Sequence, residues 1–393
     1  MTRDCRTSQL AAAPKRGWRN VLKMGALTAA VTALSAVAAP GCLDRPLEPI
    51  EPRPTSTIVE RLTQSSVDKI DLLLVIDNSG SMADKQNILQ LAVPDLVGQL
   101  VNPKCVDDAG QPSAQQPTGP LEACPEPGSQ REFEPVVDIH IGIITSSLGG
   151  HGSDTCTGSS NGSDNDFAHL IVRESTAANA ASVPTWQDKG FLVWDPSTDA
   201  PSHTPQGETN QATLIDNVKK MVGGAGEVGC GFEATLESWY RFLVDPDPFE
   251  KVTLKKDVAV LSGTDKVLLA QRADFLRPDS LLAIIMLSDE NDCSIRDGGQ
   301  FYFAAQTHNK NNQLYHLPKP RAACLTDPND KCCRSCGQAP APGCDDSKDA
   351  CGGGLSDLED KLNLRCFDQK RRFGIDFLQP ISRYVSALRD STI

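Results

Sequence analysis

Residues 71–82 have the sequence DLLLVIDNSGSM, and this stretch constrains the fold more than any other. The apolar run 72–76 ends at Asp77, which is followed closely by Ser79 and Ser81. A short apolar run that stops at turn residues is typical of a strand buried on both faces. The turn that leaves this strand carries one carboxylate and two hydroxyls, and such oxygens suit a hard divalent cation like Mg²⁺. The stretch therefore predicts a buried strand with a cation site at its end.

Predicted strands and helices alternate along the rest of the chain, as an α/β sheet requires. A second buried strand is expected at 281–287, directly before Ser288 and Asp289. A half-buried strand is expected at 137–143, where apolar residues alternate with polar ones; we expect His140, on its polar face, to be a surface or internally satisfied histidine. Apolar residues at helical spacing predict further helices around 89–100, 214–222, 232–243 and 380–388. Two short strands are suggested at 169–173 and 190–194.

The segment Asp77-x-Ser79-x-Ser81 directly follows a predicted strand, with a glycine and a methionine in family-like positions. It resembles the metal-ion-dependent adhesion site of von Willebrand factor A (VWA) domains. The resemblance implies an α/β fold with a doubly wound, mostly parallel, Rossmann-like sheet. It also implies that Mg²⁺ (or Mn²⁺ or Ca²⁺) binds at the carboxyl edge of the sheet, with Asp289 as the ligand from the fourth strand. The alternative is that Asp77 and Asp289 only cap turns and helix N-termini.

The third family motif is a threonine in the loop before the predicted helix at 232–243, and here the sequence departs from the family pattern. Cys230 or a neighbour stands where the threonine is expected. Sulfur is a poor ligand for Mg²⁺, and we expect Cys230 to form a disulfide instead. Glu227 or Glu233 is then the candidate for the missing oxygen.

The resemblance implies a non-enzymatic, extracytoplasmic binding protein that acts in protein–protein interaction or adhesion. An acidic side chain of a protein partner would complete the coordination of the cation. One alternative is a structural, disulfide-rich envelope lipoprotein whose VWA site has lost its metal, with Cys230 as the mark of that loss. A serine hydrolase is a weak third, because the G-x-S-x-G match around Ser160 lacks the preceding strand of a nucleophile elbow. The net charge of −13 argues against a nucleic-acid partner.

The N-terminus has the layout of a secretory signal peptide, which we place at residues 1–41. A basic region is followed by a small, apolar stretch and then by Cys42, in a context that resembles the lipobox of bacterial lipoproteins. This predicts an exported protein anchored by lipid to the outer membrane or the periplasmic face of the envelope. Cleavage after Ala39 without lipidation would give a secreted protein. A proline-rich tether follows at 42–56.

Twelve of the 14 cysteines lie beyond Cys42, and an even number in an exported chain predicts a framework of up to six disulfides. The pair Cys105 and Cys124 is the easiest local assignment, because both flank one polar insertion. A zinc site that includes Cys333 and Cys336 is the alternative for part of the set. The candidate disulfide cysteines are Cys105, Cys124, Cys156, Cys230, Cys293, Cys324, Cys332, Cys333, Cys336, Cys344, Cys351 and Cys366.

We expect a VWA-like domain at 57–292 that carries insertions at 103–134 and 146–210. A cysteine-rich insertion occupies 293–366, and a C-terminal helix lies within 367–393. The sequence shows no apolar strand after that helix, so the domain is expected to be atypical or truncated. An exposed sheet edge would then favour aggregation.

Overall fold

The computed structural model describes residues 68–156 and 165–390. The predicted signal peptide, Cys42, the tether and Ser160 lie outside the described residues. In the described part of the chain, no helix is long and apolar enough to cross a membrane.

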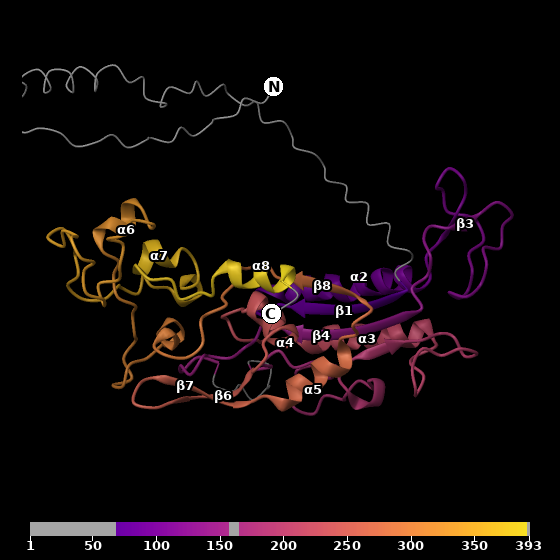
Figure 1. The fold of residues 1–393 in the computed structure, drawn as a ribbon, viewed down its shortest axis with the longest axis horizontal. Coiled ribbons are helices and arrows are strands. Elements are labelled where there is room, and N and C mark those ends of the chain that lie inside the picture. Colours follow the sequence, from indigo (N-terminus) through magenta and orange to yellow (C-terminus); the bar gives the residue numbers. More distant parts are fainter. Residues whose placement is uncertain (1–67, 157–164, 391–393) are drawn as a thin grey trace, which may run out of the picture. The chain divides into compact units, whose positions relative to one another are not determined.

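The centre of the fold is a four-stranded sheet with the strand order β5-β4-β1-β8 (Figure 1). The strands are β1 (Lys69–Ile76), β4 (Asp138–Thr145), β5 (Leu192–Trp194) and β8 (Leu281–Leu287). β1 pairs in parallel with β4 on one side and with β8 on the other, whereas β5 runs antiparallel to β4. The predicted α/β class with a mostly parallel sheet is confirmed at this level. β1 and β8, which precede the two candidate acids, are neighbours.

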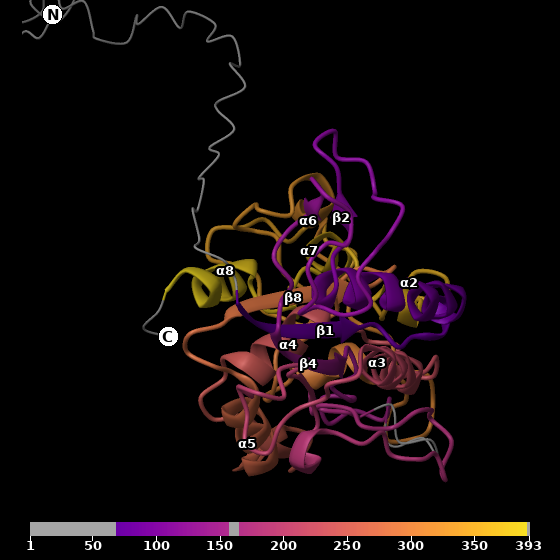
Figure 2. The same ribbon diagram turned by 90° about the vertical axis from the view of Figure 1, so that its right-hand side faces the viewer.

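The sheet is covered by helices on both faces because the side chains of β1 are apolar on both. The covering helices are α2 (Ala83–Val101), α3 (Gln211–Ala225), α4 (Thr235–Leu243), α5 (Lys266–Phe275) and α8 (Ile381–Arg389). Leu72 and Leu74 lie in a core formed with α2 and α3. Leu73 and Val75 lie in a second core, formed with α4, α5 and α8. In Figure 2, α2 and α3 lie on one side of the strands, and α4, α5 and α8 lie on the other.

β4 is buried along its whole length, so the prediction of a half-buried strand was wrong. Its polar residues Asp138 and His140 are 4% and 2% exposed. Phe191 and Phe275 pack against the His140 ring and cover this face of the strand. The alternating pattern arose because the second face buries a polar network rather than meeting water.

Other predicted elements differ in detail. α3 continues through Gly223 and Gly224 to Ala225 and is followed by Gly226, whose φ of +76° is a conformation that suits glycine. The strand that the sequence suggests at 169–173 does not form; Arg173 makes only an isolated bridge with Ser182. Two elements were not anticipated, namely α5 and the hairpin of β6 (Phe249–Leu254) and β7 (Ala259–Thr264).

Six disulfides join all twelve cysteines of the predicted framework. The pair Cys105–Cys124 is confirmed and closes the first insertion, which contains β2 (Cys105–Val106) and β3 (Gln130–Arg131). The other pairs are Cys156–Cys230, Cys293–Cys366, Cys324–Cys333, Cys332–Cys344 and Cys336–Cys351. Because Cys333 and Cys336 are both oxidised, the zinc alternative for these thiols is wrong. The framework indicates an oxidising, extracytoplasmic compartment.

The cysteine-rich region is closed at its ends by the Cys293–Cys366 bridge. It contains little regular structure: the helix α6 (Ala322–Thr326) and short 3₁₀ turns at Phe301–Ala305 and Leu362–Leu364. The short helix α7 (Gln369–Phe373) follows directly after it. Within the described residues, β8 pairs only with β1, and no strand follows residue 366. None of the residues of β8 is buried, so the prediction of a second buried strand at 281–287 was wrong in its burial, although the strand itself forms. Leu281, Leu282 and Met286 are exposed by 42, 38 and 47% because β8 lies at the edge of the sheet. The edge that the sequence predicted is therefore open in the described part of the chain.

Candidate metal centre

Asp77 lies at the carboxyl end of β1 and is fully buried. Its backbone amide continues the sheet by donating to the Leu287 carbonyl at 2.9 Å. Asp77 Oδ1 accepts a hydrogen bond from the Ser79 amide at 2.9 Å, and Oδ2 accepts one from Ser288 Oγ at 2.7 Å. Residues that follow β1 and β8 therefore fix this carboxylate in one orientation.

A chain of hydroxyls connects the first motif to Asp289. The Oγ atoms of Ser79 and Ser81 are 2.9 Å apart, and Ser81 Oγ donates to Asp289 Oδ1 at 3.0 Å. The 3₁₀ turn Gly80–Met82 carries Ser81 to this position before α2 begins. The structure thus brings together Asp77, Ser79, Ser81 and Asp289, the four residues that the sequence nominated.

A lysine is also part of this cluster. Lys85 Nζ lies 3.0 Å from Asp289 Oδ2 and donates to the Ser81 carbonyl at 3.0 Å. Hydrogen bonds from Lys85 and then from Ser81 hold the pKa of the Asp289 carboxyl below its usual range. Asp289 is therefore ionised, and its charge is shared between Ser81 and Lys85.

Glu233 occupies the loop before α4, where the family motif has a threonine. Its side chain is buried, with 4% exposure, whereas Glu227 is exposed. Burial raises the pKa of Glu233 to about 7, and the nearby charges of Asp77, Glu290 and Asp289 add to the shift. Of the two candidate glutamates in this loop, only Glu233 is buried, and the charges of Asp77 and Asp289 act on its carboxyl group. Cys230 is bound to Cys156 and offers no ligand.

Asn78 joins the first motif to the loop that carries Cys230 and Glu233. The Gly229 amide donates to the Asn78 carbonyl at 2.7 Å. Ser147 Oγ donates to Asn78 Oδ1 at 2.8 Å and accepts from the Cys230 amide at 2.9 Å. A Cβ at Gly229 would lie 2.2 Å from Asn78 Oδ1, so only glycine fits this approach. The position of the Glu233 loop therefore depends on these polar contacts.

The donor set of the cluster consists of oxygens. Three carboxyl groups (Asp77, Glu233 and Asp289) and two hydroxyls (Ser79 and Ser81) come from the carboxyl ends of two parallel strands and from the loop before α4. Hard divalent cations such as Mg²⁺ prefer ligands of this kind. These ligand types suit such an ion, and Glu233 lies in the loop where the family motif has a threonine.

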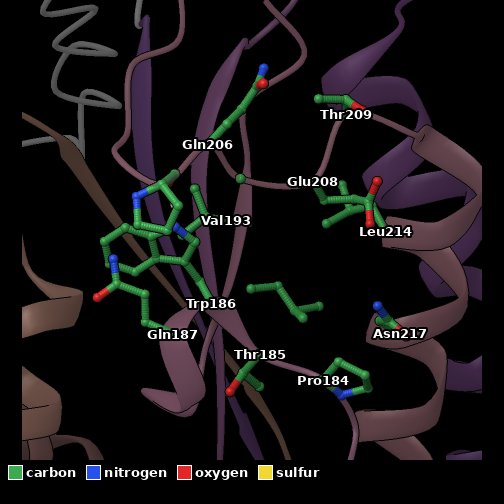
Figure 3. Close-up of a pocket in the computed structure, with 13 residues that line it drawn as sticks. Pro184, Thr185, Trp186, Gln187, Val193, Gln206, Glu208, Thr209, Leu214 and Asn217 are labelled. Atoms are coloured by element: carbon green, nitrogen blue, oxygen red, sulfur yellow. Dashed lines mark hydrogen bonds between the residues drawn. The ribbon is translucent and has the colours of Figure 1, made fainter. Parts of the chain in front are cut away.

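A cavity of about 350 Å³ lies elsewhere, between β5, the segment 205–209 and α3 (Figure 3). Trp186, Val193 and Leu214 form its apolar walls, and Glu208 is its only carboxylate. The Glu208 Oε1 atom already accepts a hydrogen bond from the Asn210 amide at 2.7 Å. None of the strand-end residues Asp77, Ser79, Ser81 and Asp289 lines this cavity, so it does not belong to the metal centre.

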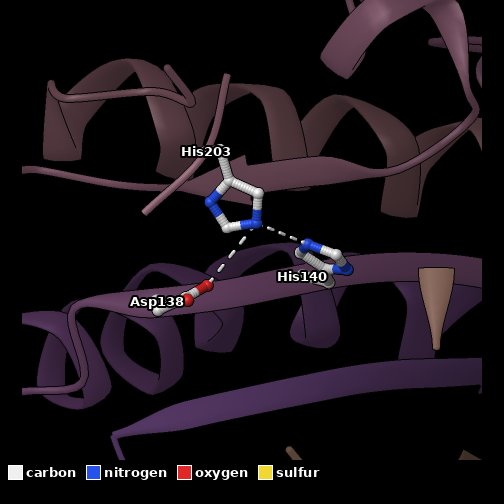
Figure 4. A group of neighbouring side chains, drawn as sticks. All are labelled: Asp138, His140 and His203. Atoms are coloured by element: carbon white, nitrogen blue, oxygen red, sulfur yellow. Dashed lines mark hydrogen bonds and ion pairs between the residues drawn. The ribbon is translucent and has the colours of Figure 1, made fainter. Parts of the chain in front are cut away.

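A second polar cluster, which the sequence did not predict as a site, lies at the amino end of β4 (Figure 4). Asp138 and His140 project from β4, and His203 approaches them from the segment after β5. Burial, followed by the charge of Arg277, lowers the pKa of His140 to about 4, so this imidazole is neutral. The sequence signal was the i, i+2 spacing of Asp138 and His140, which places both on one face of a strand. Nothing in the local sequence pointed to His203.

Comparisons with known proteins add no further identification. No protein-family model matches the chain, and searches of the curated proteins and of the solved structures find no match. The features that the structure itself establishes are a mixed α/β fold, a four-stranded and mostly parallel sheet, and six disulfides. The VWA resemblance remains a prediction from the sequence motif.

Proposed function

We propose that this protein is an extracytoplasmic binding protein of the VWA type, with a doubly wound domain that recognises a protein partner through a bound divalent cation. One observation carries the proposal. Asp77 and Asp289 lie at the ends of two adjacent parallel strands: the Ser79 amide donates to Asp77, the Ser79 and Ser81 hydroxyls are in contact, and the Ser81 hydroxyl donates to Asp289. Ligands in doubly wound folds bind at this edge of the sheet.

The exposure of the cluster favours an ion that faces a partner. Asp77 and Ser79 are buried, whereas the Asp289 side chain is 23% exposed and Ser81 lies at the surface. An ion held from the buried side would keep coordination positions open toward solvent. Mg²⁺ commonly keeps such positions for water, and a carboxylate from another protein can take the place of a water. The arrangement therefore supports binding of an acidic side chain rather than catalysis.

The roles within the site follow from the contacts. Asp77 is oriented by the Ser79 amide and Ser288 Oγ, and Asp289 by Ser81 Oγ. Glu233 is protonated in part near neutral pH, so binding a cation would release its proton. Mg²⁺ (or Mn²⁺ or Ca²⁺), when bound, would supply the positive charge that attracts the partner's carboxylate.

The ion pair between Lys85 and Asp289 favours the alternative function, a structural envelope protein whose site has lost its metal. The Lys85 ammonium group already neutralises Asp289 at 3.0 Å, which is the role that a cation would otherwise have. An exposed ion pair of this kind is weak, however, and yields readily to a divalent ion. We therefore place the metal-dependent binding function first.

Isothermal titration with Mg²⁺, Mn²⁺ and Ca²⁺ tests the proposal directly. We expect one site in the wild-type protein and no binding in Asp77→Asn, which keeps the size of the side chain but removes its charge. Asp279→Asn is the matched control, because Asp279 is an exposed acid in the turn before β8, away from the site. Equal titration curves for the wild type and Asp77→Asn would contradict the proposal. A pull-down from envelope extract distinguishes metal-dependent binding from the structural alternative. A partner that is retained without EDTA but lost with EDTA supports metal-dependent binding.

We further propose that Cys42 anchors the protein to the envelope by lipid. The support is the signal-like N-terminus and the lipobox-like context of Cys42, together with an oxidising location indicated by six disulfides. Cys42→Ser is expected to move the protein from the membrane fraction to the soluble fraction. An unchanged distribution of the variant would favour secretion without lipid.

A further inference from the structure

Asp138, His140 and His203 converge at the amino end of the sheet, where β4 begins and far along that strand from the proposed Mg²⁺ site. His140 Nε2 and His203 Nε2 are 3.0 Å apart, and His203 Nε2 lies 3.8 Å from Asp138 Oδ1 (Figure 4). One ligand atom from each residue lies within 4.8 Å of the other two. Ligands of a tetrahedral zinc ion with bonds of about 2.0–2.1 Å are separated by roughly 3.4 Å, so only small shifts are needed.

The hydrogen bonds of His140 direct a lone pair toward His203. His140 Nδ1 lies 2.7 Å from the Phe275 carbonyl, which can only accept, so Nδ1 carries the proton. The Nε2 atom of the neutral ring is then an unprotonated nitrogen. Metal-bound histidines show this arrangement, in which the other ring nitrogen donates to a carbonyl or carboxylate.

The Nδ1 atom of His203 also faces an acceptor, but at a longer distance. This atom is buried, has no hydrogen-bond partner, and lies 3.7 Å from Asp195 Oδ2. Asp195 is held in place by the amides of Ser202 and His203, at 3.1 and 3.0 Å. A proton on Nδ1 of His203 would face this carboxylate and leave Nε2 free. Two imidazoles would then direct lone pairs at each other across 3.0 Å, which is favourable only with a cation between them.

The charge balance of the network also calls for a cation. Asp71, Asp138 and Asp195 are buried, with exposures of 0, 4 and 1%. Arg277 is paired with Asp71, through Nε at 2.8 Å, and with Asp138. The guanidinium of Arg277 contacts two of these three carboxylates, whereas Asp195 is held by two backbone amides, and a buried charge without compensation is costly. A divalent ion bound to two neutral histidines would offset the excess negative charge.

We propose that Asp138, His140 and His203 bind a Zn²⁺-type transition-metal ion that fastens the segment 195–208 to the amino end of β4. Arg277, Asp195 and the Phe275 carbonyl hold the three ligands in place without contacting the ion. Imidazole nitrogen suits zinc better than magnesium, so the two proposed sites differ in the ion they select. The role is structural, because the site joins a segment that lacks regular structure to the sheet.

The test uses the full chain without a histidine tag, stripped with EDTA and dialysed against Zn²⁺ alone. Elemental analysis is expected to find one equivalent of zinc in the wild type, and Co²⁺ is expected to give the intense visible absorption of a tetrahedral site. His203→Gln removes the metal-binding nitrogen but keeps a donor toward His140, and it should weaken zinc binding at least about tenfold. His169→Gln is the control, because His169 pairs with the single carboxylate of Asp265 at 2.8 Å.

Asp138→Asn serves as a second loss-of-binding variant if His203→Gln does not fold, and near-ultraviolet circular dichroism checks the fold of each variant. The Asp77→Asn variant should still bind zinc. The zinc proposal can therefore fail or succeed independently of the proposed Mg²⁺ site. Zinc absent from the wild type would overturn the proposal. Equal zinc content in the wild type and in folded His203→Gln would also overturn it.

Discussion

Ser81 donates its hydroxyl hydrogen to Asp289 Oδ1 across 3.0 Å, although 208 residues separate them in the sequence. The contact exists because β1 and β8 are adjacent parallel strands whose carboxyl ends meet. The turns that leave these two strands, which carry Ser81 and Asp289, therefore lie at the same edge of the sheet. Substitutions at this edge are therefore expected to affect cation binding far more than the stability of the sheet.

Replacement of Lys85 by Met is expected to strengthen Mg²⁺ binding several-fold. The Lys85 ammonium competes for Asp289 Oδ2, at 3.0 Å, and a divalent ion must displace it. Titration calorimetry at low and high ionic strength measures the effect, which should shrink with added salt because the pair is exposed. Lys220→Met is the matched control, since Lys220 pairs with Asp216 on α3 at 2.7 Å. An unchanged affinity at low salt would show that Lys85 does not compete.

Glu233→Gln is expected to stabilise the metal-free protein at alkaline pH. The pKa of Glu233 is about 7 in the folded protein, against 4.5 for an ordinary glutamate. As the pH rises between these values, the unfolded chain loses its proton first, so the wild type loses stability, and the loss is complete above about pH 7. The complete loss of unfolding free energy amounts to a few kcal/mol, because one pKa unit corresponds to about 1.4 kcal/mol.

Urea unfolding in EDTA at about pH 5 and about pH 8 measures this loss, which Glu233→Gln should abolish. The exposed Glu132→Gln variant should behave as the wild type does. The same Glu233→Gln protein should bind Mg²⁺ more weakly, because it lacks the third carboxylate. Equal pH dependence in wild type and variant would show that Glu233 is not held protonated by burial.

Loss of the Cys156–Cys230 bridge is expected to weaken Mg²⁺ binding. Cys230 follows Gly229 in the loop that Asn78 and Ser147 hold beside Asp77, and Glu233 lies three residues further on. The double variant Cys156→Ser/Cys230→Ser loosens that loop. Its bridge spans 74 residues, which corresponds to a stabilisation of about 4 kcal/mol in the loop-entropy treatment.

Cys105→Ser/Cys124→Ser provides the comparison, because that bridge closes an insertion remote from the site and spans 19 residues. It should lower the stability, by about 3 kcal/mol, but leave the Mg²⁺ affinity unchanged. Denaturant titration and calorimetry on both double variants separate the two effects. The same Mg²⁺ affinity in both would mean that the Cys230 loop does not position a ligand.

Arg277→Met is expected to destabilise the zinc-free protein by about 3–5 kcal/mol, because it leaves buried carboxylates without their counter-charge. Arg277 contacts Asp71 through Nε and its backbone amide, both at 2.8 Å, and also contacts Asp138. Chemical denaturation gives the free energy of unfolding. Lys69→Met is the control and should change little, because Lys69 pairs with the exposed Asp279. A small effect of Arg277→Met would show that the carboxylates are neutralised in another way.

The elements that the sequence predicted well are those with a strong local signal. The apolar runs of β1 and β8 and the helical spacing in α2, α3, α4 and α8 gave the correct type of element. Asp77 and Asp289 could be assigned to one edge because parallel strands align their carboxyl ends. The misassigned strand at 169–173 had a local pattern but no partner strand, and strand pairing is a long-range property that a single segment does not contain.

By itself, the amino-acid sequence determined the α/β class, the oxidised cysteines and the position of four oxygen-bearing residues after two strands. These depend on short-range periodicity and on composition. Only the tertiary structure decided that Lys85 neutralises Asp289, that Glu233 rather than Glu227 is buried beside Asp77, and that His203 meets Asp138 and His140. Each of these results depends on side chains that are distant in sequence, because loop paths and burial set their distances and charges.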